Sequence, residues 1–431
     1  MKKVFIILIT VVATILVAFL GWYFLLRNPN IPVGEAIRDI LPFGSGDDIS
    51  GPTTNDPRLT TGTGEQQVFD EFAVPTAKLF RLSNTPVAGA VVLNPRSTSS
   101  GQGSTSTTIV RYVDRATGHI YDVNLATLEK TKVTNQTLPK IYEAYFRPDG
   151  NAVLFRSLKN DSDVVENLSL ALTPPTATVS TTSTSSGQAS SPQASTLYSV
   201  SSTALRGDIS SVAVGSGNTL FYALRDTSSI VSSAFNGTGV KNLFTSAFSN
   251  WRLTTSGNSL VIHTKASANV PGYAYTLNPS NGALTKIVGP LNGLVAISNA
   301  AGTRGLYSYA EGNRTRLFAQ DLKSGAATEI LPATLAEKCI WSIKKAGTLF
   351  CAVPTSGVGA GEPDNWYRGL THFSDQIWHF DNDSDIAQLI SEPKNDLDVD
   401  IDVSLLKLSP NEDYLIFINK TDLSLWALKL E

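Results

Sequence analysis

Short apolar stretches bounded by polar turns recur along residues 77–431, and none of them shows the spacing of an amphipathic helix. In one kind of stretch, a turn rich in Gly, Pro, Asp or Asn precedes an apolar strand. Residues 147–150 (Arg-Pro-Asp-Gly) come before 153–155, and residues 409–411 (Ser-Pro-Asn) come before 415–417. Apolar runs of this length between turn residues are typical of β-strands. The pattern predicts an all-β domain over 77–431.

A second marker, an aromatic residue followed by a polar turn, gives the repeat its period. Where no insertion intervenes, equivalent positions lie 43 residues apart, at 232, 275 and 318. A period near 40–45 residues made of short strands is typical of a β-propeller. With residues 231–234 as the weakest copy, we predict seven blades of four strands. The aromatic markers, which we interpret as core residues together with Trp251 and Trp341, are Tyr121, Tyr198, Tyr275, Phe318, Trp378 and Trp426.

The last repeat contains only three strands before the chain stops. Residues 77–82 have the pattern of an outer strand, so we predict that they pair with the strand near 424–429. Such pairing joins both ends of the domain and removes an open sheet edge.

The turns at 147–150 and 408–411 resemble the WD40-like repeats of TolB-type β-propeller proteins. The whole chain is similar to uncharacterised, membrane-anchored propeller proteins of candidate-phylum bacteria. The resemblance covers residues 77–431 and implies a propeller fold with a binding role. It brings no catalytic residues, and the Gly-His and Trp-Asp pairs of true WD40 blades are absent.

An unbroken apolar run covers residues 4–26. As a helix it would be about 35 Å long, enough to cross a bilayer. A cleaved signal peptide is the alternative, but the run is too long and no small-residue cleavage site follows it. Lys2 and Lys3 outweigh Arg27, which places the N-terminus in the cytoplasm and the rest of the chain outside. We therefore predict that residues 1–27 form a cytoplasmic stub and a single-pass signal anchor in the lipid bilayer of the cell membrane.

Four segments differ from the repeat in composition. Residues 28–76 are rich in Pro, Gly, Thr and Asp, which predicts a flexible extracytoplasmic linker. The Ser/Thr-rich stretches near 96–108 and 173–196 cannot bury enough apolar surface to offset their ordering entropy, and we predict disordered insertions. Residues 357–376 are instead dense in aromatic, Arg and His side chains, which predicts an ordered insertion.

Within this ordered insertion, Trp366, Tyr367, Arg368 and His372 form a candidate binding surface. Propellers bind through loops around their channel, and Trp, Tyr and Arg are enriched at recognition sites. The alternative is that the insertion folds back and packs on its own blade.

The two cysteines of the chain, Cys339 and Cys351, flank one predicted hairpin turn. Their positions place them opposite each other or one residue apart on adjacent strands. In an oxidising extracytoplasmic compartment we predict a disulfide between them. The alternative is a pair of buried free thiols.

Two acidic stretches are weak candidates for metal binding. Asp381, Asp383 and Asp385 resemble the opening of a calcium loop, but the sixth position lacks the required Gly, so a hairpin turn is favoured. Asp residues alternate with apolar residues over 396–402, which predicts a strand with its carboxylates on one face. Asp398 and Asp400 could then meet a cation, although a solvated edge is favoured. We predict no cofactor.

Charge and motifs narrow the function. Charged residues make up 16% of the chain, the net charge is −3, and no basic run occurs, which argues against nucleic acid as a partner. No hydrolase, zinc-protease or P-loop motif is present, so the sequence favours a protein without enzymatic activity. We predict a protein-binding or scaffolding module at the cell envelope, whose partner is an envelope protein or polymer. The alternative is an extracytoplasmic enzyme or a glycan-binding sensor that uses the channel face.

Overall fold

The computed structural model describes residues 77–93, 107–159, 164–175, 197–257 and 259–430. The chain divides into two compact units, 1–67 and 68–431, and all described residues belong to the second unit. The predicted membrane anchor, the linker and nearly all of both Ser/Thr-rich insertions lie outside the described residues. Within the described ranges, no helix is long and apolar enough to cross a membrane.

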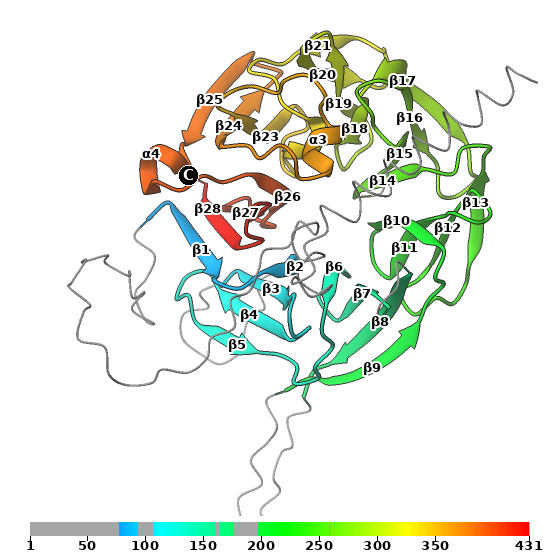
Figure 1. Ribbon diagram of the computed structural model, residues 1–431, viewed down its shortest axis with the longest axis vertical. Coiled ribbons are helices and arrows are strands. Elements are labelled where there is room, and N and C mark those ends of the chain that lie inside the picture. Colours follow the sequence, from blue (N-terminus) through cyan, green and yellow to red (C-terminus); the bar gives the residue numbers. More distant parts are fainter. Residues whose placement is uncertain (1–76, 94–106, 160–163, 176–196, 258, 431) are drawn as a thin grey trace, which may run out of the picture. The chain divides into compact units, whose positions relative to one another are not determined.

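Seven four-stranded antiparallel sheets form the blades of a propeller, with the first strand of each blade nearest the centre of the ring (Figure 1). Blades 1 to 3 comprise β2 (Val87–Leu93), β3 (Ile109–Asp114), β4 (Ile120–Asn124) and β5 (Lys130–Lys132); β6 (Ile141–Phe146), β7 (Ala152–Leu158), β8 (Val165–Thr173) and β9 (Ser199–Ala204); β10 (Ile209–Val214), β11 (Thr219–Leu224), β12 (Ser229–Ala234) and β13 (Lys241–Thr245). Blades 4 and 5 comprise β14 (Trp251–Ser256), β15 (Ser259–Thr264), β16 (Pro271–Leu277) and β17 (Leu284–Asn292); β18 (Val295–Ser298), β19 (Arg304–Glu311), β20 (Arg314–Asp321) and β21 (Ala327–Glu329).

Blades 6 and 7 comprise β22 (Cys339–Trp341), β23 (Thr348–Pro354), β24 (Asp375–Asp381) and β25 (Ile386–Ser391); β26 (Val403–Leu408), β27 (Tyr414–Asn419), β28 (Leu425–Lys429) and β1 (Leu79–Ser83). Three short helices lie in the described connections around these blades. They are η1 (Ala336–Lys338) before β22, α3 (Asp364–Tyr367) between β23 and β24, and α4 (Pro393–Leu397) between β25 and β26. The prediction of a seven-bladed propeller with four-stranded blades is confirmed, and β12 is the weak third copy. The N-terminal helix of that prediction belongs to the part of the chain outside the description.

The ring closes as predicted. β1 pairs antiparallel with β28 as the outermost strand of blade 7, with Leu79 opposite Leu428 and Arg81 opposite Trp426. Blade 7 is thus built from strands at both ends of the domain. The hydrogen bonds between β1 and β28 close the ring of blades.

Hydrophobic cores lie between neighbouring blades. Middle strands pack on both faces, and all seven residues of β23 are buried. This explains why their sequences read as continuous apolar runs, as expected for strands covered on both sides. Trp251 and Trp341 are buried in two such cores, 3% and 4% exposed, as the sequence predicted.

One aromatic marker was assigned to the wrong strand. Tyr198 lies just before β9, the outer strand of blade 2, whereas the third strand of that blade is β8. The residue serves a packing role from its outer position, because the Arg111 guanidinium lies 4.8 Å from the centre of its ring. β8 lacks an aromatic residue at the marker position, so Tyr198 was the nearest match to the pattern.

The predicted strand over 396–402 is also wrong. The segment begins as helix α4, and Asp398 ends this helix in the left-handed region at φ 55°. Asp tolerates this conformation because its short polar side chain can hydrogen-bond locally. The alternating carboxylates therefore do not share a face: Asp398 and Asp400 are exposed, whereas Asp402 is fully buried.

The predicted disulfide is confirmed. Cys339 and Cys351 are directly opposite each other on β22 and β23 and are joined through their sulfur atoms. The bond links the innermost strand of blade 6 to its neighbour.

Candidate functional site

The insertion between β23 and β24 folds back onto the propeller, and its short helix α3 lies near the middle of the ring (Figure 1). Trp366 is only 4% exposed and packs with Leu335, Val358 and Phe373 in a separate small core. The sequence predicted Trp366 as part of a binding surface, but the side chain is buried. Burial of its large apolar ring stabilises the folded insertion. The segment is ordered because it has a core of its own.

Beneath Trp366 lies a fully buried ionic cluster, formed by Lys338, Asp375 and Asp402. The Lys338 ammonium lies 2.8 Å from an Asp375 oxygen and 2.7 Å from an Asp402 oxygen, and all three side chains are 0% exposed. Lys338 also donates to the Val403 carbonyl at 2.9 Å. The indole N–H of Trp366 donates to the Asp402 carboxylate at 2.9 Å. The cluster joins blade 6, blade 7 and the insertion.

Two cations face the Trp366 ring. The Lys338 ammonium lies 4.8 Å from the ring centre, and the Lys420 ammonium lies 5.1 Å from it. Lys420 also donates to the Trp366 carbonyl at 2.7 Å. Because cations are attracted to the face of an indole ring, these contacts help to hold the insertion against the propeller.

Within this cluster, burial shifts the pKa of Asp375. Burial raises its pKa to about 6, and the charge of Asp402 acts in the same direction. One oxygen of Asp375 accepts from Lys338 and from the Val403 amide at 2.7 Å, whereas its other oxygen has no hydrogen-bond partner among the described residues. A buried carboxylate with an unpaired oxygen favours its protonated form.

With Trp366 held below, other residues of the insertion are left on the surface. Tyr367 is 37% exposed and Leu370 is 70% exposed, and Arg368 and His372 are exposed as well. We call these four residues the ridge. Three of them belong to the predicted binding surface, and Leu370 was missed because a lone Leu between polar residues gives no signal in the sequence. The ridge is thus a set of exposed side chains on a well-anchored base.

A carboxyl group pairs with the ridge. The Tyr367 hydroxyl donates to Glu337 at 2.5 Å. Burial raises the pKa of Glu337 to about 7, against the opposing effects of Tyr367 and the nearby cations Lys338, Arg252 and Lys420. A carboxyl with a pKa near neutrality can both accept and donate a proton. This pair is the part of the site best suited to acid–base chemistry.

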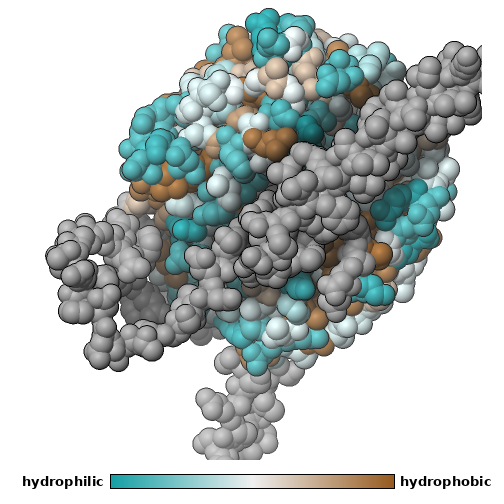
Figure 2. Space-filling model, in the orientation of Figure 1, coloured by the Kyte–Doolittle hydropathy of each residue, from teal (hydrophilic) through white to brown (hydrophobic). Residues whose placement is uncertain are grey.

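The surface around the insertion is mixed in character. On the face shown, residues outside the grey atoms are mainly hydrophilic, with hydrophobic residues in separate spots (Figure 2). Scattered apolar residues are normal for a protein surface, whereas a docking site usually shows a continuous patch. Recognition on this face would therefore depend on a few anchor residues.

The acidic candidates have structural roles. The Asp381 carboxylate accepts from the Asp383 amide and the Ser384 hydroxyl within the turn that precedes β25. Asp383 pairs with Arg304 at 3.1 Å. Asp385 lies in the same turn with φ 52°, and Asp398 and Asp400 both pair with Lys394. Among the described residues, no group of three or more His, Cys, Asp and Glu side chains is placed to hold a metal ion.

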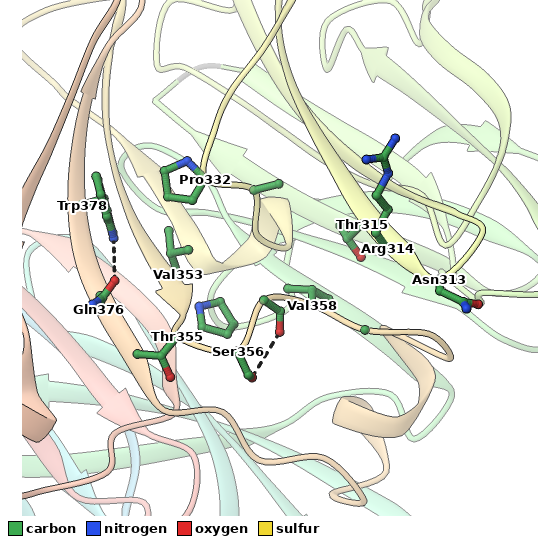
Figure 3. Close-up of a pocket in the computed structure, with 14 residues that line it drawn as sticks. Asn313, Arg314, Thr315, Pro332, Val353, Thr355, Ser356, Val358, Gln376 and Trp378 are labelled. Atoms are coloured by element: carbon green, nitrogen blue, oxygen red, sulfur yellow. Dashed lines mark hydrogen bonds between the residues drawn. The ribbon is translucent and has the colours of Figure 1, made fainter.

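A cavity of about 450 Å³ lies where blade 5 meets blade 6, against the start of the insertion (Figure 3). Arg314 and Asn313 lie on one side of it and Trp378 and Gln376 on the other, with Val353 and Val358 between them. The indole N–H of Trp378 donates to the Gln376 side chain at 3.3 Å. No motif predicts this cavity, because its walls come from four separate segments.

Comparison with known proteins gives the fold alone. No known family model matches the chain, and no curated protein matches it. Among solved structures, an oligogalacturonate lyase in complex with manganese has a TM-score of 0.50 at 10% identity, covering 82% of this chain and 93% of that chain. The oligogalacturonate lyase of Vibrio parahaemolyticus has a TM-score of 0.49 at 9% identity, with the same coverage of 82% and 93%.

TolB from Acinetobacter baumannii is also similar, with a TM-score of 0.39 at 12% identity, covering 70% of this chain and 64% of that chain. At 10% identity, the likeness to the manganese-bound lyase extends to the fold and not to its chemistry. The resemblance to membrane-anchored proteins of candidate-phylum bacteria receives no support from these comparisons. The comparisons therefore support the fold of this chain and assign it no function.

Proposed function

We propose that this protein is a membrane-anchored, extracytoplasmic binding module that presents the insertion-bearing face of its propeller to a protein or polymer of the cell envelope. The observation that supports this function is the ridge. Four side chains suited to recognition are exposed on a segment whose base is fixed by a small core and a buried ionic cluster. Preorganised anchors bind well because little entropy is lost when a partner docks.

The anchor and the topology of this proposal come from the sequence. Residues 4–26 would fix the chain in the bilayer, and residues 28–76 would act as a flexible linker. The disulfide agrees with an oxidising compartment, since such bonds are rare in the reducing cytosol.

The test is a cross-linking pull-down of the full-length protein from its native membrane, with and without a ridge variant (Arg368→Ala, Leu370→Ser, His372→Ala). All three side chains are exposed, so the variant should fold normally. We expect it to lose the cross-linked partner, whereas Val240→Ser, an exposed residue of blade 3, should keep it. Equal capture by both variants would contradict the proposed role of the ridge.

One observation favours enzymatic activity as a second candidate. Glu337 has a pKa near neutrality and lies beside the Tyr367 hydroxyl, which is the kind of pair that transfers protons. Because the fold also occurs in an oligogalacturonate lyase solved with manganese, oligogalacturonates with added manganese are a sensible first substrate set. Unsaturated products formed by the wild type and lost in Glu337→Gln would establish this activity. If no products form, the binding function remains the better proposal.

A further inference from the structure

The cavity between blades 5 and 6 has a distinctive charge. Among the described residues, its lining includes one ionisable side chain, Arg314, and no acidic residue. The Glu311 carboxylate lies 3.7 Å from the Arg314 guanidinium and already accepts from Arg316 at 2.9 Å. The Arg314 side chain is 73% exposed, so its donors remain largely available. The cavity therefore favours a ligand that carries one negative charge.

The remaining walls are apolar or neutral. Val353 is 3% exposed and Val358 is 7% exposed, and together with Pro332 they form an apolar region between the two sides (Figure 3). Trp378 adds an indole ring beside Gln376. Asn313 and Ser356 add neutral hydrogen-bonding groups. An apolar region with a few polar groups that fix orientation is typical of a ligand pocket.

The pocket is built before any ligand arrives. Its inner wall contains Val358, which is held in the same small core as Trp366. The Thr315 amide of blade 5 donates to the Val358 carbonyl at 3.3 Å, so the wall is tied to both blades. A preformed wall of this kind lowers the entropy cost of binding.

We propose that this pocket binds the C-terminal carboxylate of a partner polypeptide, with Arg314 holding the carboxylate and the apolar region holding an aliphatic or aromatic last side chain. Arg pairs with carboxylates in a two-pronged geometry, and capture of a chain terminus is a recurring mode of peptide recognition. A saccharide fits less well, because the lining residues that the structure describes offer no acidic acceptor for its many hydroxyl donors. The inference rests on the proposed binding function and assigns it a class of partner.

The test uses the full-length chain purified in a mild detergent and a fluorescein-labelled Gly-Ser-Gly-Ser-Gly peptide extended by Leu, Val or Phe. Each peptide is prepared as the free acid and as the C-terminal amide, and binding is followed by fluorescence polarisation. We expect at least one acid to bind about tenfold or more tightly than its amide. Arg314→Gln should remove this preference, and Arg314→Lys should retain part of it.

Arg225→Gln, which changes an exposed arginine of blade 3, is the matched control and should keep the preference. Equal binding of acid and amide, no saturable binding, or an Arg314→Gln protein that still prefers the acid would overturn the proposal. Tighter Arg314-dependent binding of an acidic oligosaccharide would assign the pocket to a different ligand and overturn it too.

The ridge variant is included in the same titration to separate the two proposals. If it loses the envelope partner but keeps the acid-specific peptide, both proposals stand. If the pull-down shows no effect of the ridge while the peptide still binds through Arg314, only the proposed role of the ridge fails. If partner capture depends on the ridge but the protein binds the free-acid peptide no more tightly than its amide, only the pocket assignment fails.

Discussion

Two regions of the propeller join neighbouring blades through buried cations, and they do so in different ways. At the boundary between blades 1 and 2 and at that between blades 2 and 3, the cation is an arginine on the second strand of the preceding blade. Arg111 pairs with Asp122 at 2.7 Å and donates to the Gly150 carbonyl of blade 2, and Arg156 pairs with Glu143 and donates to the Ile209 carbonyl of blade 3. Between blades 6 and 7 the cation is Lys338, with Asp375 and Asp402 as partners.

The difference lies in the solvation of the acids. Asp122 and Glu143 keep 20% and 40% of their side chains exposed, whereas Asp375 and Asp402 are 0% exposed. An ion pair whose acid remains partly exposed to solvent has a small desolvation penalty. Two fully buried carboxylates beside one lysine have a large desolvation penalty. The insertion covers this second cluster with Trp366, so the same segment that presents the ridge also removes water from the charges that hold it. We infer that the cluster serves to position the ridge more than to add stability.

The largest effect should come from Lys338→Met, which leaves two buried carboxylates without their cation. Removing one partner of a buried ion pair typically costs about 3–5 kcal/mol. We expect a large fall in the thermal unfolding midpoint and a loss of partner capture in the pull-down.

The control is the triple variant Lys338→Met, Asp375→Asn, Asp402→Asn, which removes the uncompensated charges together with the lysine. It should recover a substantial part of the stability, because the cost arises from unpaired charge and not from the absence of a lysine. A single variant as stable as the wild type would show that the two regions do not differ in this respect.

The next effect is a pH dependence of stability that arises from the buried ionic cluster of Lys338, Asp375 and Asp402. Because burial raises the pKa of Asp375 to about 6, above its unfolded value near 4, the folded state binds this proton more tightly. The free energy of unfolding should therefore rise as the pH falls from about 6 to 4, by an amount on the order of 2–3 kcal/mol from this group.

His263 opposes this trend, since burial lowers its pKa to about 4 and stability from this group is lost as the pH falls below about 6.5. Glu337, whose pKa is raised to about 7, acts in the same direction as Asp375. Comparing wild type with Asp375→Asn by urea unfolding at several pH values cancels the contributions of both His263 and Glu337. The difference between the two proteins should change steeply between pH 4 and 6, on the order of the shift cited. Parallel curves would mean that Asp375 is ionised at little cost.

The contrast also explains what the sequence could reveal. Strand periodicity and the recurring turns predicted seven blades, and the incomplete last repeat predicted the pairing of β1 with β28, since these features arise from local chemistry that each repeat restates. Cys339 and Cys351 could be paired because they flank a single hairpin. The cluster of Lys338, Asp375 and Asp402 could not be predicted, because its members come from three segments and a buried charge looks like an exposed one in a sequence.

The same reason accounts for the errors at the candidate site. Trp366 has the composition of a binding residue, and only the acceptor provided by Asp402, 36 positions away, shows why it is buried. The alternation over 396–402 suggested a strand, but Pro393 starts a helix there and the left-handed Asp398 ends it. Tertiary partners overrode local pattern at both places.

The smallest informative change tests the buried arginines, whose acidic partners are partly solvated. Arg111→Met keeps the apolar volume of the side chain and removes its bonds to Asp122 and Gly150. Because Asp122 can regain water, we expect a loss of about 1–2 kcal/mol, clearly less than for Lys338→Met, with partner capture unchanged. Arg81→Gln, which breaks an ion pair with Asp422 whose side chains are 28% and 44% exposed, sets the lower end of the scale at about 0.2–1 kcal/mol. If Arg111→Met destabilised the protein as much as Lys338→Met, exposure of the acid would not be what separates the two regions, and the ridge would have no special support.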